Sequence, residues 1–337
     1  MKKPIIILAI LAVLAVPAFC GVVKKAQSEV AFKGFGRLSM TQAMKLVPER
    51  QWTDTQSDFK GKGLLGGLAG KTLLRSGNFG EIIDLPALTL ANLNPKKMEY
   101  TIDPIKKIEQ KKAAEKEGKG EEKKPAESDI KIVKSQFKVD DTGEAKDING
   151  FPTKKYVLTW IVDWENVRTG EKGTDRLETA VWATPYSTTI TEARDEEMRF
   201  SKGYMKAVGL DQEKMTQDVL GSSWMSMLDG MNAAKGRPGV SPDAAKAAVE
   251  MKKIKGYPIV IDGKYFASSE KPKGEEGEEP SKGGLLGGLA KKVLKKKPSE
   301  AETNEPALSY RIEILELAVK SLGEADFKIP PGYKKKG

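Results

Sequence analysis

The residues whose spacing could support cofactor chemistry gather first in a glycine-rich segment. Gly61, Gly63 and Gly66 have the G-x-G-x-x-G spacing of a dinucleotide-binding turn. The run from Gly70 to Thr72, which reads Gly-Lys-Thr, matches the end of a phosphate-binding loop. A complete loop of that kind would need a glycine at the position of Leu65, and no clear apolar strand leads into the segment. We therefore predict no nucleotide site here.

A second copy of the segment supports this conclusion. The sequence from Gly63 to Ala69 recurs from Gly284 to Ala290, but Lys291 and Val293 replace the glycine and threonine of the Gly-Lys-Thr group. What the repeat preserves is apolar surface. The leucines that both copies of this run keep are Leu64, Leu65 and Leu68 in the first and Leu285, Leu286 and Leu289 in the second.

As a helix, the second copy would be amphipathic, with leucines along one stripe and lysines and glycines along the other. Each interior glycine costs about 1 kcal/mol relative to alanine, so such a short helix would need a surface to pack on. Two hypotheses stay open. The copies are either apolar flaps over a cavity or membrane-touching segments, or they are flexible glycine-rich loops of no special role. Under the first hypothesis the six leucines are candidate ligand-binding residues.

Histidine is absent from the whole chain. This absence excludes Ser-His and Cys-His nucleophilic sites and every His-ligated zinc site. Chemistry with paired carboxylates is formally open, but no pair stands out among the 47 aspartate and glutamate residues. We therefore predict that the protein is not an enzyme and that it holds no cofactor and no metal.

The N-terminus predicts export. Lys2 and Lys3 precede an apolar run from Ile5 to Val16, which suits a secretory signal. The run is too short to span a bilayer, which takes about 20 residues. We expect residues 1–20 to be a signal peptide and residues 21–337 to form a single periplasmic domain. Export and an aromatic content of 7% both argue against nucleic-acid binding.

Cys20, the only cysteine, offers an alternative to a soluble protein. It could be the acylated residue of an outer-membrane lipoprotein. That chemistry requires a small residue directly before the cysteine and an aliphatic one three before it, and Phe19 and Pro17 stand there instead. We therefore favour a cleavable signal, cut before Phe19 or after Cys20.

The clearest element is a pair of strands, residues 155–165 and 175–184, joined by a polar, glycine-containing loop. Alternation places Tyr156, Trp160 and Trp164 on one face of the first strand, together with Leu158 and Val162. We predict an antiparallel hairpin with one wide apolar face. Tyr156, Trp160 and Trp164 are candidate ligand-binding residues in the wall of a cavity; the alternative is that this face is packed core.

The remaining patterns predict an antiparallel α+β domain with most of its helix in the middle of the chain. Residues 211–231 carry methionines and a tryptophan at helical spacing, and Ser241 and Pro242 are suited to begin a helix that runs to about Lys253. Segments 109–129 and 268–306 are expected to be disordered insertions, because they are rich in charge and glycine. Further strands are predicted over 30–40, 51–59, 72–83, 88–92, 98–102, 130–139, 259–267 and, with a helix as the alternative, 310–319.

Several short motifs carry a resemblance to a known family. They are the turn from Ile148 to Phe151 with Lys154-Lys155-Tyr156 after it, the turn from Asn94 to Tyr100, the late Gly256-Tyr257-Pro258, and the ending Phe327-Lys328-Ile329-Pro330-Pro331-Gly332-Tyr333. With these motifs the chain resembles a family of exported bacterial domains related to the LolA/LolB-like lipoprotein-carrier superfamily.

The resemblance implies a half-barrel, which is an open, strongly curved antiparallel sheet with helices across its concave side. It also implies a periplasmic location and binding of acyl chains or lipoproteins. Our first prediction is a non-enzymatic periplasmic protein that binds a lipid, an acyl chain or another apolar or amphipathic ligand, with peripheral membrane contact through the leucine-glycine copies. The alternative is a structural or interaction protein of the envelope, whose basic C-terminal lysines contact anionic partners.

Overall fold

β-Strands account for most of the residues that the structure describes. The computed structural model describes residues 19–63, 76–108, 129–210, 244–270 and 305–336. The helices are α2 (Thr188–Ala207), α4 (Ala244–Met251) and the short 3₁₀ helix η2 (Glu324–Phe327). In chain order the strands are β1 (Phe19–Phe32), β2 (Gly36–Val47), β3 (Arg50–Gly61), β4 (Gly77–Asp84), β5 (Thr89–Asn94), β6 (Glu99–Pro104), β7 (Ile130–Ile148), β8 (Phe151–Asn166), β9 (Lys172–Thr184), β10 (Tyr257–Glu270), β11 (Leu308–Leu322) and β12 (Lys334–Lys335).

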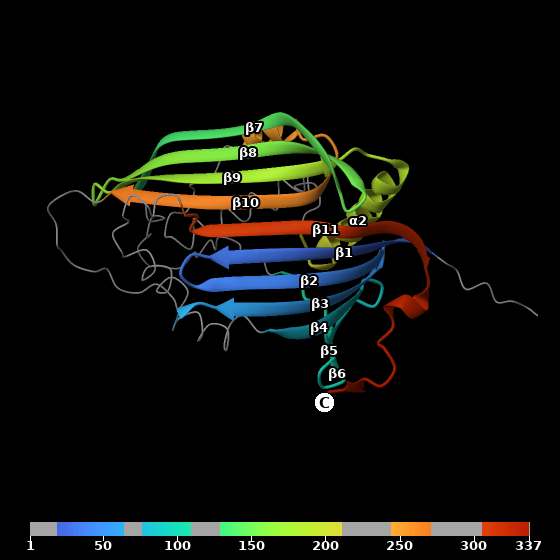
Figure 1. The fold of residues 1–337 in the computed structure, drawn as a ribbon. Coiled ribbons are helices and arrows are strands. Elements are labelled where there is room, and N and C mark those ends of the chain that lie inside the picture. The colour runs from blue at the N-terminus through green and yellow to red at the C-terminus, as the bar shows by residue number, and fades with distance from the viewer. Residues whose placement is uncertain (1–18, 64–75, 109–128, 211–243, 271–304, 337) are drawn as a thin grey trace, which may run out of the picture.

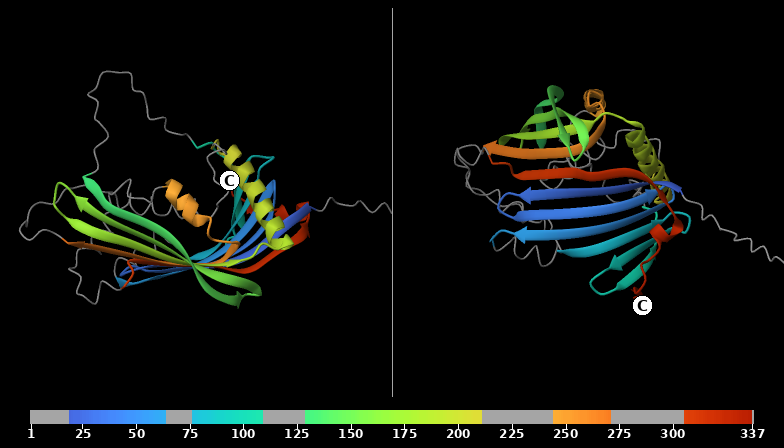
Figure 2. Two further views of the ribbon diagram at one scale, coloured as in Figure 1. Left: turned by 90° about the horizontal axis from the view of Figure 1, so that it is seen from above. Right: turned by 45° about the vertical axis from the view of Figure 1, so that its right-hand side comes forward.

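These twelve strands form one sheet, in the order β12-β6-β5-β4-β3-β2-β1-β11-β10-β9-β8-β7. Neighbouring strands are antiparallel, except that β12 runs parallel to β6. Figure 1 shows β1 and β11 side by side in the middle of the sheet. The sheet is strongly curved and its two edges do not meet (Figure 2). The predicted open, curved antiparallel sheet is therefore confirmed.

Both α-helices lie on the concave side of the sheet, as predicted (Figure 2). Helix α2 buries Ile190, Ala193 and Phe200 in a cluster with Val22 of β1 and Met44 of β2. Helix α4 lies farther along the sheet, where its Met251 packs in a cluster with Tyr156, Leu158 and Val181. Apolar burial on one face is what holds each helix there, because it removes that face from water.

Polar contacts fix α2 at both its start and its middle. The Ser187 hydroxyl accepts a hydrogen bond from the Ile190 backbone N–H at 3.3 Å and so caps the helix. Glu197 forms an ion pair with Lys24 of β1 and accepts a hydrogen bond from the Tyr257 hydroxyl at 2.9 Å. Burial, and then the Glu197 carboxylate, raise the pKa of the Tyr257 phenol far above its usual value. The phenol therefore stays a hydrogen-bond donor to α2.

The turn between β7 and β8 gives one of the sequence motifs a structural role. Asn149 and Gly150 have positive φ angles of 53° and 82°, and Ile148 pairs with Phe151 across them. Two positive φ values in a two-residue loop are the requirement of a type I′ hairpin, for which Asn-Gly is the favoured sequence. The Asn149 side chain also donates to the Ile314 backbone carbonyl at 2.9 Å, which ties the hairpin tip to β11.

The C-terminal motif packs on the convex face at the opposite end of the sheet. Phe327 is buried with Val47 and Leu322, while Ile329 and Tyr333 pack against a cluster on β4 and β5. The backbone then pairs with the edge strand β6, where Lys334 N–H donates to Met98 and Lys336 N–H donates to Tyr100. The lysines that we expected to contact anionic partners thus begin in a strand that covers part of a sheet edge.

Asp326 is expected to fasten this C-terminal segment, so Asp326→Asn should destabilise the protein by about 1 kcal/mol. Its carboxylate accepts from Lys45 Nζ at 2.8 Å and from the Gly323 backbone N–H at 2.9 Å. The hydrogen bond from Lys45, and after it the one from Gly323, lower the pKa of the Asp326 carboxyl. Because the pKa of Asp326 is lower in the folded state than in the unfolded state, its bonds stabilise the fold fully at pH values above the unfolded-state pKa. This stabilisation is lost as the pH falls through the folded-state pKa.

Urea denaturation at neutral and at acid pH measures this prediction. The difference between Asp326→Asn and the parent protein should shrink toward zero in acid. A difference that stays constant with pH would contradict the assignment, and Asp54→Asn, an exposed carboxylate on the same convex face, is the control.

Several strand predictions need correction. The strand predicted over 30–40 is wrong, because β1 ends at Phe32 and a turn separates it from β2. The strand predicted over 130–139 continues to Ile148, and the ambiguous 310–319 segment is the strand β11. Two ends of the segments expected to be disordered are ordered. Residues 268–270 belong to β10, and the Asp129 backbone carbonyl, at the end of segment 109–129, accepts a hydrogen bond from the Val167 backbone N–H. Helix α2 had not been predicted, and the helix predicted over 211–231 lies outside the described residues.

Strand β1 begins within the segment expected to be the signal. Phe19 and Cys20 pair with Leu322 and Ser321 of β11. Cleavage before Phe19 would leave this strand complete, whereas cleavage after Cys20 would remove both pairs.

Candidate functional site

The three aromatic residues predicted to form a wall do lie on one face of β8. Register places Tyr156, Trp160 and Trp164 on the concave face, the same face that the helices cover. They are 1%, 0% and 6% exposed, so these side chains are buried and not open to solvent. The six candidate leucines, Leu64, Leu65, Leu68, Leu285, Leu286 and Leu289, lie outside the described residues.

The apolar face extends from β8 across three further strands. Trp160 belongs to a cluster with Leu177 of β9, Tyr265 of β10, and Leu308 and Tyr310 of β11. All of these side chains are less than a tenth exposed. The predicted wide apolar face is therefore larger than the hairpin that suggested it.

One polar contact crosses this wall. The Tyr310 ring lies over Gly263, where a Cβ atom would come within 2.2 Å of the ring. Because Gly263 has no side chain, the phenol can cross β10 and its oxygen lies 2.9 Å from the Thr179 hydroxyl on β9. Both hydroxyls are buried, so each satisfies the other in an apolar setting.

Two further polar groups are buried in the same wall. The Asp175 side chain on β9 is 0% exposed and lies in register with Val162. The indole N–H of Trp160 has no hydrogen-bond acceptor among the residues that the structure describes. Buried donors without partners are uncommon in folded proteins, since each costs about 1–3 kcal/mol.

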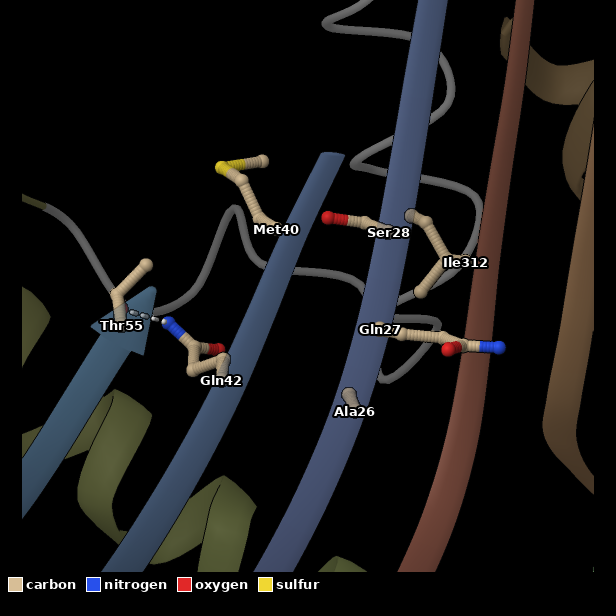
Figure 3. Close-up of a pocket in the computed structure, with 7 residues that line it drawn as sticks. All are labelled: Ala26, Gln27, Ser28, Met40, Gln42, Thr55 and Ile312. Carbon is tan, nitrogen blue, oxygen red and sulfur yellow. Dashed lines mark hydrogen bonds between the residues drawn. The ribbon is translucent and has the colours of Figure 1, made fainter. Parts of the chain in front are cut away.

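A hollow of about 210 Å³ opens on the concave face where β11, β1, β2 and β3 meet. Figure 3 shows that Ser28, Met40 and Ile312 point into one space, with Gln42 and Thr55 joined by a hydrogen bond of 3.5 Å beside them. Ala26 and Gln27 complete the lining. We had not predicted these residues from the sequence, although the alternation Leu38, Met40, Gln42, Met44, Leu46 in β2 could have indicated the half-polar inner face.

The rim of the concave face beyond the hollow carries exposed aromatic residues. Phe32 at the end of β1 is 41% exposed and Phe79 of β4 is 42% exposed. Phe32 contacts Phe35 edge to face, and Phe35 contacts Phe59, at ring-centroid distances of 6.1 and 5.8 Å. Ile312 in the hollow is equally exposed, at 42%. Several large apolar side chains are thus open to solvent around one depression.

Charge on this face is sparse near the hollow. Lys24 is engaged by Glu197, as described above. Glu81 of β4 lies in register with Thr53 and Asn92, and it has no ion pair with any residue for which the structure gives a position. The Glu81 side chain is partly buried, and this burial raises the pKa of its carboxyl.

Comparison of the chain with protein-family models, with curated protein sequences and with solved structures finds no match in any of the three. The resemblance to the LolA/LolB-like superfamily therefore stays a prediction from its motifs. Across the described ranges, no helix has the length and apolar character to cross a membrane. The same residues form no group of cysteine, aspartate and glutamate side chains that could hold a metal ion.

Proposed function

We propose that this protein is an exported, periplasmic binding protein, not an enzyme, that holds a lipid, an acyl chain or a similar amphipath on the concave face of its sheet. The observation that carries the proposal is the hollow between Met40 and Ile312, which opens beside the exposed ring of Phe79 and the buried aromatic wall. Exposed apolar side chains around a depression are typical of ligand grooves.

The size of the hollow favours a narrow ligand. Pockets that enclose drug-sized molecules measure roughly 300–1,000 Å³. The hollow measures about 210 Å³ and is open toward the concave face of the sheet, which we call the trough. It suits part of a chain-like molecule that continues along the face, and it is too small to enclose a bulky folded cofactor.

The motifs support the same proposal. The Asn149-Gly150 turn and the C-terminal ending occupy defined places in an open, curved sheet, which is the architecture that the lipoprotein-carrier resemblance implies. A lipid, or the acyl part of a lipoprotein, is therefore the partner that we propose. The leucine-glycine copies remain candidates for contact with a membrane.

Native mass spectrometry of the protein purified from its own periplasm tests the proposal, together with titration by a neutral fluorescent lipid probe. We expect a co-purifying lipid or acyl species, and saturable uptake of the probe. Met40→Glu places a charge in the hollow and should weaken probe binding at least about tenfold, because burying an unpaired charge is costly. Ser39→Glu, the neighbouring residue on the convex face of β2, should leave binding unchanged.

Clean apo-protein that takes up no probe would overturn this proposal. If an envelope protein co-purified instead, the alternative of a structural or interaction protein would be favoured.

A further inference from the structure

The concave face is mainly apolar on β8 to β11 and carries a patch of polar side chains among apolar ones on β1 to β3. On β8 to β11 the side chains facing the trough are mainly aromatic and aliphatic, as in the cluster around Trp160. On β2 and β3 the register pairs Gln42 with Thr55, and in the next row Ser28 of β1 and Ser57 of β3 lie on either side of Met40. These four side chains offer hydroxyl and amide groups, which donate and accept hydrogen bonds without charge. An amphipathic ligand would meet hydrocarbon on one side of the trough and hydrogen-bonding groups on the other.

The sign of the charges on this face differs from that of the whole chain. The formal net charge is +10, but most basic side chains of the strands point to the convex face. Within the described strands β1 to β11, register places only Lys24 and Lys154 on the concave face. Lys24 is already paired with Glu197, and Lys154 lies on β8, four strands away from β1. The trough therefore offers no free cation beside the hollow among these strand residues.

Glu81 adds a negative charge beside this polar patch instead. It faces the trough on β4, two residues along the strand from Phe79, whose pair with Thr55 borders the hollow. Its partial burial, its raised pKa and the lack of an ion pair within the described ranges leave a carboxylate that a ligand cation could stabilise. An anionic headgroup would meet repulsion at the same place.

We infer that the ligand is a lipid-like amphipath whose headgroup forms hydrogen bonds and carries no net negative charge. The hydrocarbon part lies toward β8 to β11, and the headgroup lies over Ser28, Gln42 and Thr55, within reach of Glu81. The inference rests on the proposed function and specifies the chemical class of its ligand.

Three probes with the same alkyl chain test the inference: a primary alkylamine, a monoacylglycerol and a fatty acid in its ionised form. Displacement of a neutral fluorescent lipid from the full-length protein gives the three affinities. We expect the amine and the glyceride to bind, and the carboxylate to bind at least about tenfold more weakly. Equal binding of all three would overturn the headgroup inference and leave the proposed function standing. Binding of none would overturn both.

Glu81→Gln identifies the residue responsible. It should weaken the amine about tenfold relative to the glyceride, because it removes the counter-charge and keeps the shape of the side chain. Asp54→Asn, on the opposite face of the adjacent strand β3, should change neither affinity. An unchanged ratio of amine to glyceride affinity in Glu81→Gln would contradict the role of Glu81. Thermal unfolding of both variants confirms that they fold.

Discussion

Truncation of Trp160 to alanine is expected to lower the free energy of unfolding by about 3–5 kcal/mol, the range for removing a large aromatic side chain from a core. Trp160 is 0% exposed and is the largest of the fully buried side chains in the described core. It packs in a cluster with Leu177, Tyr265 and Tyr310, which come from three neighbouring strands. Its loss would leave a cavity that the stiff sheet cannot close by collapsing.

Urea denaturation followed by circular dichroism measures this effect. Phe79→Ala removes an aromatic ring from the same concave face where the ring is 42% exposed, and we expect it to cost less than about 1 kcal/mol. If the two variants lost similar stability, the assignment of Trp160 to the packed wall and of Phe79 to the open rim would be wrong.

The second large effect is expected at Gly263, where substitution by alanine should destabilise the protein by about 3 kcal/mol. Alanine in place of glycine within a strand ordinarily adds about 0.5–1 kcal/mol of stability, so the expected sign is opposite to the usual one. The reason is steric, because a Cβ atom would come within 2.2 Å of the Tyr310 ring. The ring would have to move and would give up its buried hydrogen bond to Thr179.

A double-mutant cycle isolates this contact. In a Tyr310→Ala background, Gly263→Ala should cost little or become stabilising, since the ring that it displaces is gone. Gly323→Ala is the control, because nothing lies within 4 Å of the position its Cβ would take. Equal costs of Gly263→Ala in both backgrounds would show that Tyr310 is not what the alanine disturbs.

The elements predicted well are those with strict alternation. Strand β8 alternates without a break from Tyr156 to Trp164, and its buried face lies where the alternation placed it. The tight turn at Gly150 was also recognised, although the strand before it was predicted to end at residue 139 and in fact continues to Ile148. In both cases the information is local, since side-chain period and turn geometry each depend on a few consecutive residues.

Helix α2 escaped prediction because its apolar residues are few and its surface is highly charged. Only Ile190, Ala193 and Phe200 supply buried apolar contacts over twenty residues. Its position depends on contacts with β1, β2 and β11 that no local pattern contains. Ser187, placed three residues before Ile190, was the available signal, since serine is a favoured N-cap.

The candidate site was harder to predict than the strands that form it. Ser28, Gln42 and Thr55 come from three strands, and they lie near one another only because the registers of β1, β2 and β3 place them in two neighbouring rows. Their types carry no chemical signature, so the sequence alone could not single them out. Tyr156, Trp160 and Trp164 were singled out because they are large and alternate, and the same features make them core residues.

The place of β11 in the sheet has a consequence for the order in which the chain can fold. Strands β1 to β6 follow one another across one half of the sheet, and β7 to β10 across the other, so each half can grow from hairpins. Among the described strands, β11 is the one that pairs with both halves, and it spans Leu308–Leu322, near the end of the chain. N-terminal segments fold first during synthesis, so the two halves stay unjoined until synthesis has passed Leu322, after all the other described strands except β12. For a protein that we propose is exported, the complete sheet could therefore form only after β11 has been synthesised.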